Sequence, residues 1–74
     1  MNNNGKLAFD YYRINFFPGD FPDPGERASL AILEAQDRAR FWVVPGIWEV
    51  ISNRSACVTV RRTRPAHYRK PNGR

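Results

Sequence analysis

The sequence is poor in the residues that crosslink small proteins through disulfides or bound metals. Among its 74 residues Cys57 is the only cysteine and His67 the only histidine. One cysteine excludes an intramolecular disulfide, and the two residues together supply too few ligands for a structural zinc site. A chain of this length buries only about 60% of the surface that its unfolded form exposes. The apolar core must therefore stabilise the fold without a disulfide or a structural metal.

Long apolar runs are also missing. Residues 1–6 lack the apolar stretch of a signal peptide, and no segment approaches the roughly 18 consecutive apolar residues of a membrane span. Cys57 lies in the short apolar run Ala56-Cys57-Val58, where a cysteine is more simply a small buried hydrophobe than a nucleophile. A lone reduced cysteine fits a reducing compartment. We therefore expect a cytoplasmic protein without a membrane partner.

Acidic residues are absent from the last 21 residues. Residues 1–53 carry five Lys/Arg against seven Asp/Glu, a net charge of −2, whereas residues 54–74 carry +7, which together give the overall +5. The basic residues of this segment are Arg54, Arg61, Arg62, Arg64, Arg69, Lys70 and Arg74. This asymmetry predicts a contact surface for something anionic, either a phosphate backbone or an acidic protein face. The alternative is a solvated basic tail that only aids solubility.

The segment from Leu7 to Phe17 is dense in aromatic and β-branched residues, which predicts a first strand. Two apolar alternations overlap in it, so either a bulge lies near Tyr11 or apolar groups occupy both faces. Its aromatic residues are Phe9, Tyr11, Tyr12, Phe16 and Phe17. Beside Arg13 such a cluster could stack single-stranded bases, but no RNA-binding strand signature accompanies it. Core packing is therefore the favoured interpretation.

A helix is predicted from about Pro24 to Phe41, after a loop rich in proline and glycine. Asp23 supplies an N-cap, Pro24 occupies the first helical position, and Glu26 follows the cap by three residues. The stripe expected to face a sheet is made of small residues, namely Ala28, Ala31, Ile32, Ala35 and Ala39. Leu30, Leu33 and Phe41 project elsewhere. Either the helix is buried more widely than one stripe, or these three side chains form an exposed docking patch.

Pro45-Gly46 then makes a turn, and residues 47–51 and 56–61 are predicted to form a hairpin joined by residues 52–55. The predicted fold class is α+β, a two-layer β-α-β-β unit with a three-stranded antiparallel sheet in the order 1-3-2 and one helix on one face. The domain covers residues 7–65. Residues 1–6 are expected to be flexible, and residues 66–74 form a basic flexible tail.

The sequence shows no recognisable set of catalytic residues. His67 is the single histidine available as a base, and it lies in the predicted tail, where it cannot hold a fixed geometry with Cys57. No phosphate-cradling glycine motif or calcium-loop pattern is present. We therefore expect a monomeric binding protein with no enzymatic activity, cofactor or metal.

The whole unit resembles the small host-takeover proteins of lytic phages. The features that carry the resemblance are the acidic helix over residues 26–40, the aromatic turn over residues 41–50 and the arginine-rich strand over residues 58–65. Some members of that group bind host RNA polymerase. The resemblance covers residues 7–65 in outline and implies a transcription regulator in the host cytoplasm that inhibits initiation or alters termination. Small phage inhibitors of other nucleoprotein machines, such as anti-CRISPR proteins, share this outline.

The predicted partner-binding residues are basic groups with an apolar anchor. The basic groups are Arg54, Arg61, Arg62, Arg64, Arg69 and Lys70, and the candidate anchors are Trp48 or the group Leu30, Leu33 and Phe41. Trp48 could equally be a core residue. Direct binding of nucleic acid through the same arginines remains an alternative, because they could contact phosphates without reading sequence.

Overall fold

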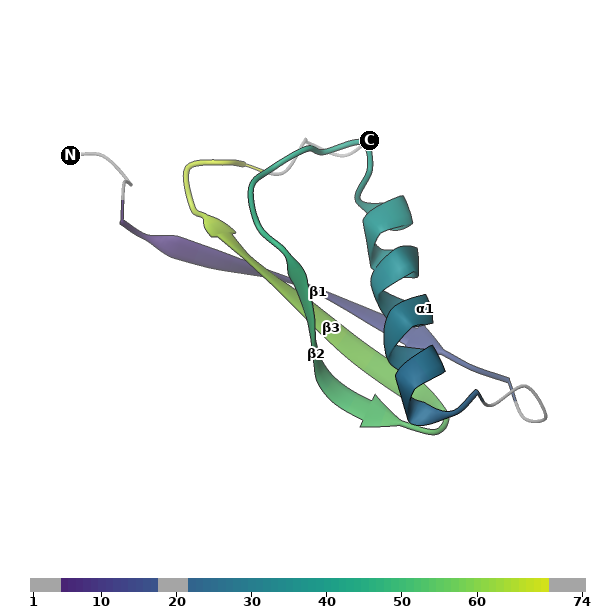
Figure 1. The fold of residues 1–74 in the computed structure, drawn as a ribbon. Coiled ribbons are helices and arrows are strands. Elements are labelled where there is room, and N and C mark those ends of the chain that lie inside the picture. The colour runs from purple at the N-terminus through teal and green to yellow at the C-terminus, as the bar shows by residue number, and fades with distance from the viewer. Residues whose placement is uncertain (1–4, 18–21, 70–74) are drawn as a thin grey trace.

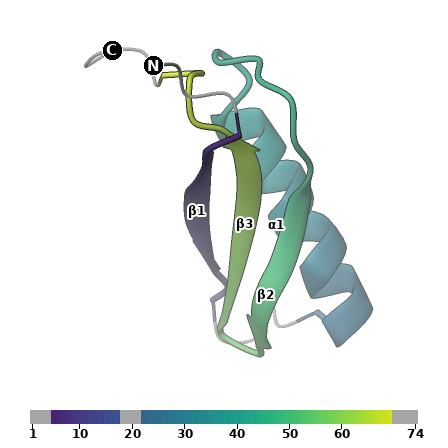
Figure 2. The same cartoon turned by 90° about the vertical axis from the view of Figure 1, so that its left-hand side faces the viewer.

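The computed structural model describes residues 5–17 and 22–69, which form three strands and one helix (Figure 1). In chain order these elements are β1 (Leu7–Asn15), α1 (Pro24–Arg38), β2 (Trp48–Arg54) and β3 (Cys57–Pro65). The strands form one antiparallel sheet in the order β1-β3-β2, and α1 lies across one face of it (Figure 2). The predicted α+β fold, strand order and single helix layer are confirmed.

β1 pairs with β3 along its whole length without a bulge. Of the two alternatives for this strand, apolar groups on both faces is therefore the correct one. Tyr12 and Ile14 point to the helix side, where Ile14 is buried and Tyr12 packs against the core. Phe9 and Tyr11 occupy the opposite face and are exposed. The strand ends at Asn15, slightly before the predicted end.

The start of α1 follows its capping pattern. The Asp23 carboxylate accepts a hydrogen bond from the backbone N–H of Glu26 at 2.8 Å, and Pro24 is the first helical residue. The first turn is also tied to the sheet, because the buried Arg27 donates through Nε to Oδ1 of Asn53 at 2.8 Å. Sequence analysis did not single out this buried arginine.

The end of α1 comes at Arg38, three residues before the predicted end. Ala39 leaves helical geometry, with φ −97° and ψ 8°, and the N–H of Trp42 donates to the carbonyl of Ala39 at 3.0 Å. The chain then turns back towards the sheet. Residues 39–47 thus form a loop that places the Trp42 ring beside the guanidinium groups of Arg62 and Arg64.

The core is small. It consists of Ile14, Ala31, Ala35, Ala39, Trp48, Val58 and Val60. Ala31 and Ala35 are fully buried, so the predicted alanine stripe does face the sheet. Because alanine has so little volume, the helix backbone lies close to the strands, and Val58 and Val60 are the largest side chains that are fully buried in the described residues.

The hairpin is longer and its turn tighter than predicted. The predicted strands 47–51 and 56–61 both stop short of their observed ends. β2 continues past a register shift in its middle, which leaves Ser55 and Ala56 in the turn instead of four residues. β3 continues as far as Pro65 because β1 pairs with it over that length.

The two ends of the described chain meet beside the sheet. The N–H of Ala66 donates to the carbonyl of Lys6 at 3.0 Å, and the N–H of Tyr68 donates to the carbonyl of Pro65 at 3.2 Å. The first of these bonds joins Ala66 to Lys6, and the second closes a turn after β3, so these bonds involve residues of both predicted flexible segments. The remainder of both predicted flexible segments, residues 1–4 and 70–74, lies outside the described residues. α1, the helix of the described part, is too short and too polar to cross a membrane.

Candidate partner-binding surface

The face of the sheet that α1 leaves uncovered carries a patch of aromatic and charged side chains, and Figure 2 looks onto this face. Phe9 and Tyr11 of β1 are 48% and 56% exposed there. Arg61 of β3 lies opposite Tyr11, and Glu49 of β2 lies opposite Arg61. We call Phe9, Tyr11, Arg61 and Glu49 the open-face patch. It forms a cross-strand row over all three strands.

Arg61 is the centre of this patch. Its Nη2 and Nε donate to Oε2 of Glu49 at 2.6 and 3.0 Å. Its guanidinium carbon lies 5.1 Å from the centroid of the Phe9 ring, a cation–π distance. The hydrogen bond with the Glu49 carboxylate raises the pKa of the Arg61 guanidinium above its ordinary value. Arg61 is therefore always charged, and Glu49 neutralises that charge locally.

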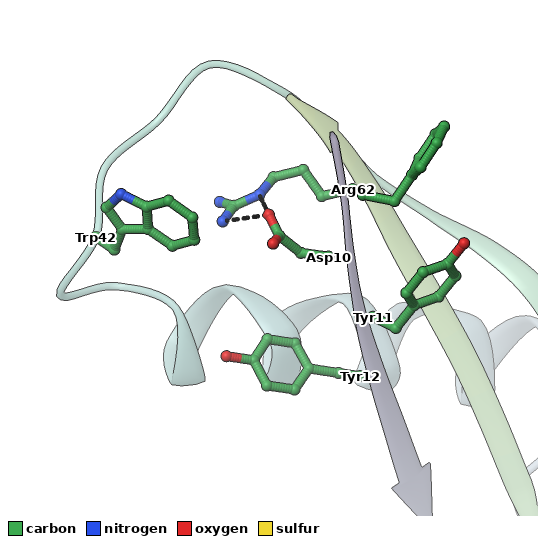
Figure 3. Close-up of a pocket in the computed structure, with 6 residues that line it drawn as sticks. Asp10, Tyr11, Tyr12, Trp42 and Arg62 are labelled. Atoms are coloured by element: carbon green, nitrogen blue, oxygen red, sulfur yellow. Dashed lines mark hydrogen bonds and ion pairs between the residues drawn. The ribbon is translucent and has the colours of Figure 1, made fainter. Parts of the chain in front are cut away.

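Two arginines predicted to form the partner surface point to the other side of the sheet. Arg62 is 5% exposed, and its Nε and Nη2 donate to Oδ2 of Asp10 at 3.3 and 3.2 Å (Figure 3). Arg64 donates to the same oxygen through Nε at 2.9 Å, and its side chain is 12% exposed. Neither guanidinium is available to a partner, so the prediction is wrong for Arg62 and Arg64.

Tryptophan rings complete the surroundings of these arginines. The guanidinium carbon of Arg62 lies 4.7 Å from the centroid of the Trp48 ring and 5.4 Å from that of Trp42. Arg64 lies 4.7 Å from the Trp42 ring. Trp48 is itself buried among the core residues. Of the two alternatives for Trp48, core residue is the correct one, and it cannot serve as an exposed anchor.

The other predicted site residues are scattered. Arg54 is exposed at the end of β2, Arg69 is exposed beyond β3, and Lys70 lies outside the described residues. Leu30, Leu33 and Phe41 are all exposed, so the interpretation that α1 is buried widely enough to cover them is wrong. They lie on the helix layer and its following loop, away from the open-face patch.

Sequence analysis missed the exposed aromatic residues of β1. Phe9 and Tyr11 were expected to pack in the core together with the other aromatic residues of this segment, and they do not. Tyr12 and Phe16 do pack against the core, whereas Phe17 is exposed. The available signal was the pair of overlapping alternations, since two phases in one strand place apolar groups on both faces.

Reactive groups are dispersed within the described residues. Cys57 begins β3 and His67 lies in the turn after its other end. β3 spans about 26 Å at about 3.3 Å per residue, so the two lie at opposite ends of the strand and are not arranged as nucleophile and base. A cavity of about 300 Å³ beside the sheet is lined by Phe9, Asp10, Tyr11, Tyr12, Trp42 and Arg62 (Figure 3). Its charged groups, Asp10 and Arg62, already bond to each other. No three His, Cys, Asp or Glu side chains of the described part converge as metal ligands.

Comparisons of the chain with protein-family models, with curated proteins and with solved structures find no match. The fold and the open-face patch are therefore the observations from which a function is inferred.

Proposed function

We propose that this chain is a non-catalytic regulator of bacterial transcription that acts in the cytoplasm and binds RNA polymerase through the open-face patch. The observation that supports this surface is the exposure of Phe9 and Tyr11 beside Arg61 on a sheet face that α1 leaves uncovered. Tyrosine and arginine are among the residue types that dominate binding energy at protein interfaces. The choice of polymerase rests on the outline resemblance to phage host-takeover proteins.

The state of the charged groups favours a protein partner over nucleic acid. Glu49 neutralises Arg61, and Arg61 in turn lies over the ring of Phe9. Binding of single strands relies on free cations along the backbone and on open ring faces for base stacking. A mixed patch of this kind instead suits a protein surface that offers both apolar contact and complementary charge.

The mechanism we propose is occlusion. A bound module of this size would cover part of the polymerase surface and would block promoter use or alter termination. The exposed Arg54 and Arg69 would strengthen attraction to an acidic surface, because charge mainly accelerates encounter, while desolvated aromatic groups supply most of the affinity.

Promoter-dependent transcription by purified bacterial RNA polymerase tests this proposal. At micromolar concentration the wild-type chain is expected to change initiation or termination. Arg61→Glu should lose the effect, because the new carboxylate faces Glu49 and no longer offers a guanidinium. Arg40→Glu is the matched control, since Arg40 is exposed in the loop after α1 and reversal there should leave the effect unchanged.

Two results would contradict the proposal, provided that circular dichroism shows both variants to be folded. A wild-type chain without effect on either step rejects polymerase as the partner. An active Arg61→Glu variant places the site elsewhere, with the exposed Leu30, Leu33 and Phe41 as the next candidate. Nuclease-treated pull-down from a bacterial lysate would then report whether another nucleoprotein machine is captured.

Direct binding of single-stranded nucleic acid is the second candidate function. The observation that favours it is charge segregation, because Glu49 is the one acid of the described residues on the open face, while Arg13, Arg54 and Arg61 share the outward-facing phase. Binding of a labelled single-stranded oligonucleotide should then weaken steeply between 50 and 200 mM salt, as about one counterion is released per neutralised phosphate. A flat salt response, or no binding at 50 mM salt, rejects this function.

A further inference from the structure

β1 is an open edge strand. The sheet order places β1 and β2 at the two edges. β2 is interrupted by a register shift and packs closely against α1, whereas β1 runs for 9 residues without a bulge, a proline or a glycine. An edge of this kind presents unpaired N–H and C=O groups that another strand can pair with. Most proteins protect such edges with bulges, prolines or a covering element.

The outward-facing backbone groups of β1 follow from its pairing with β3. Lys6 accepts a hydrogen bond from Ala66, and Phe16 donates one to Ala56, so the even-numbered residues of this segment bond to β3. Bonded and non-bonded pairs alternate along an antiparallel ladder. The odd-numbered residues, Leu7, Phe9, Tyr11, Arg13 and Asn15, therefore direct both their N–H and C=O groups towards the open edge.

We propose that two copies of this chain pair through β1 in antiparallel orientation, with Tyr11 of one copy opposite Tyr11 of the other. Antiparallel pairing across this edge must place odd-numbered residues opposite odd-numbered residues. Tyr11 is the middle residue of β1, so this register keeps the whole strand paired. The five outward N–H groups of each copy would form about ten backbone hydrogen bonds. The result is a continuous six-stranded sheet.

The side chains of β1 are self-complementary in this register. On the open face Phe9 would lie opposite Arg13 of the second copy, an aromatic–cation pair of the type that Phe9 already forms with Arg61. On the helix side Asp10 would lie opposite Tyr12. A register centred on residue 10 or on residue 12 would leave the strand ends unpaired. The register centred on residue 10 would also set Asp10 against Asp10.

A second copy fits this edge better than an unrelated strand because the chain itself needs support. Only Val58 and Val60 are large and fully buried among the described residues, and oligomerisation is one route by which such small domains gain stability. α1 lies behind β2 and β3, so it leaves the β1 edge accessible (Figure 2). The proposed dimer differs from the monomer expected from the sequence, and it does not depend on the proposed polymerase function.

Cysteine cross-linking in a Cys57→Ser background tests the pairing and its register. In the proposed dimer the Cα atoms of the two Tyr11 residues would be about 5.5 Å apart, within the range of a disulfide. Tyr11→Cys is therefore expected to form covalent dimers on mild oxidation. Phe9→Cys is the matched control, because its two copies would lie about 14 Å apart along the strands. Both positions are exposed, so neither substitution removes core packing.

Sedimentation of the unmodified wild-type chain provides an independent readout, with the mass of a dimer expected at about 100 µM. A monomer at that concentration overturns the proposal. Cross-linking of Phe9→Cys as rapid as that of Tyr11→Cys also overturns it, because random collision or another register would then explain both products. Neither result bears on transcription, so this proposal and the polymerase proposal can fail separately.

Discussion

At the scale of single residues, Asp10 is the acidic partner that Arg62 and Arg64 of β3 share. Its Oδ2 accepts hydrogen bonds from both Arg62 and Arg64, and the side chains of Asp10 and Arg62 are 17% and 6% exposed. Removing one partner of a buried ion pair leaves an uncompensated charge, which is more costly than losing an exposed pair. The Arg61–Glu49 pair on the open face is the exposed counterpart within the same sheet.

We predict that Asp10→Ala lowers the free energy of unfolding by roughly 3–5 kcal/mol, because Arg62 would be left charged and largely buried. Glu49→Ala, the matched control, should cost no more than about 1 kcal/mol. Urea denaturation of both variants measures the difference. Equal losses would contradict the distinction between a buried and an exposed arginine.

Gly46 is the second residue whose identity is dictated by geometry. Its φ is +135°, and a Cβ built on it would lie 2.5 Å from the carbonyl oxygen of Thr63. Gly46→Ala should therefore destabilise the protein by more than about 1 kcal/mol, through strain and loss of loop contact with β3. Gly25→Ala is the control, since a Cβ there meets only an ordinary contact and the helical position should gain about 0.4–1 kcal/mol. Thermal midpoints that move in the same direction would be inconsistent with this account.

At this scale, contacts between residues close together in the sequence were predictable, and contacts between residues far apart in the sequence were not. Asp23 caps α1 as expected because its partner, the N–H of Glu26, is three residues away. The partner of Arg62 is Asp10, 52 residues earlier, and a count of charges treats every arginine as free. One signal was present, because Arg62 shares the alternating phase of the buried Val58 and Val60.

At the scale of elements, the alanine face of α1 sets the spacing between helix and sheet. Ala35→Phe should overpack this layer and cost about 1–3 kcal/mol, because Ala35 is fully buried. Leu33→Phe introduces the same ring at an exposed position on the same helix and should change stability by less than about 0.5 kcal/mol. Chemical denaturation that shows an unchanged midpoint for Ala35→Phe would mean that the helix packs through another face.

The elements themselves were predicted well where their signals are local. The start of α1 and the existence of all three strands follow from capping and alternation. The lengths of the strands do not, because β3 extends to Pro65 through pairing with β1, and β2 passes a register shift that no turn residue marks. Similarly, periodicity could not decide which phase of β1 faces the core, and so Phe9 and Tyr11 were expected to pack there with the other aromatic residues, whereas they are exposed.

At the scale of the whole molecule, pairing through the open β1 edge would supply stability that the small core does not provide. A dimer that forms through β1 stabilises the folded state by mass action, so its stability rises with the logarithm of the protein concentration. We therefore predict that the thermal midpoint of the wild-type chain rises between about 5 and 200 µM. Tyr11→Pro, which removes an outward N–H and leaves the bonds to β3 in place, should abolish that rise. A midpoint independent of concentration in the wild-type chain would contradict dimer formation.

Pairing through β1 would also place two open-face patches on one continuous sheet. Such a surface could present two copies of Phe9 and Arg61 to a partner. The open-face patch consequently remains the candidate binding surface whether the chain acts as one copy or two. Its exposed aromatic residues, Phe9 and Tyr11, are the groups expected to supply most of the affinity.

The affinity of the chain for purified bacterial RNA polymerase, measured at equilibrium for the wild type, Phe9→Ala and Leu33→Ala, tests the central claim most directly. Phe9 and Leu33 are both exposed and apolar, but they lie on opposite layers of the molecule. The account predicts micromolar or tighter binding by the wild type, a Kd at least about tenfold weaker for Phe9→Ala and a change below about twofold for Leu33→Ala. Absence of wild-type binding, or a loss confined to Leu33→Ala, would contradict it.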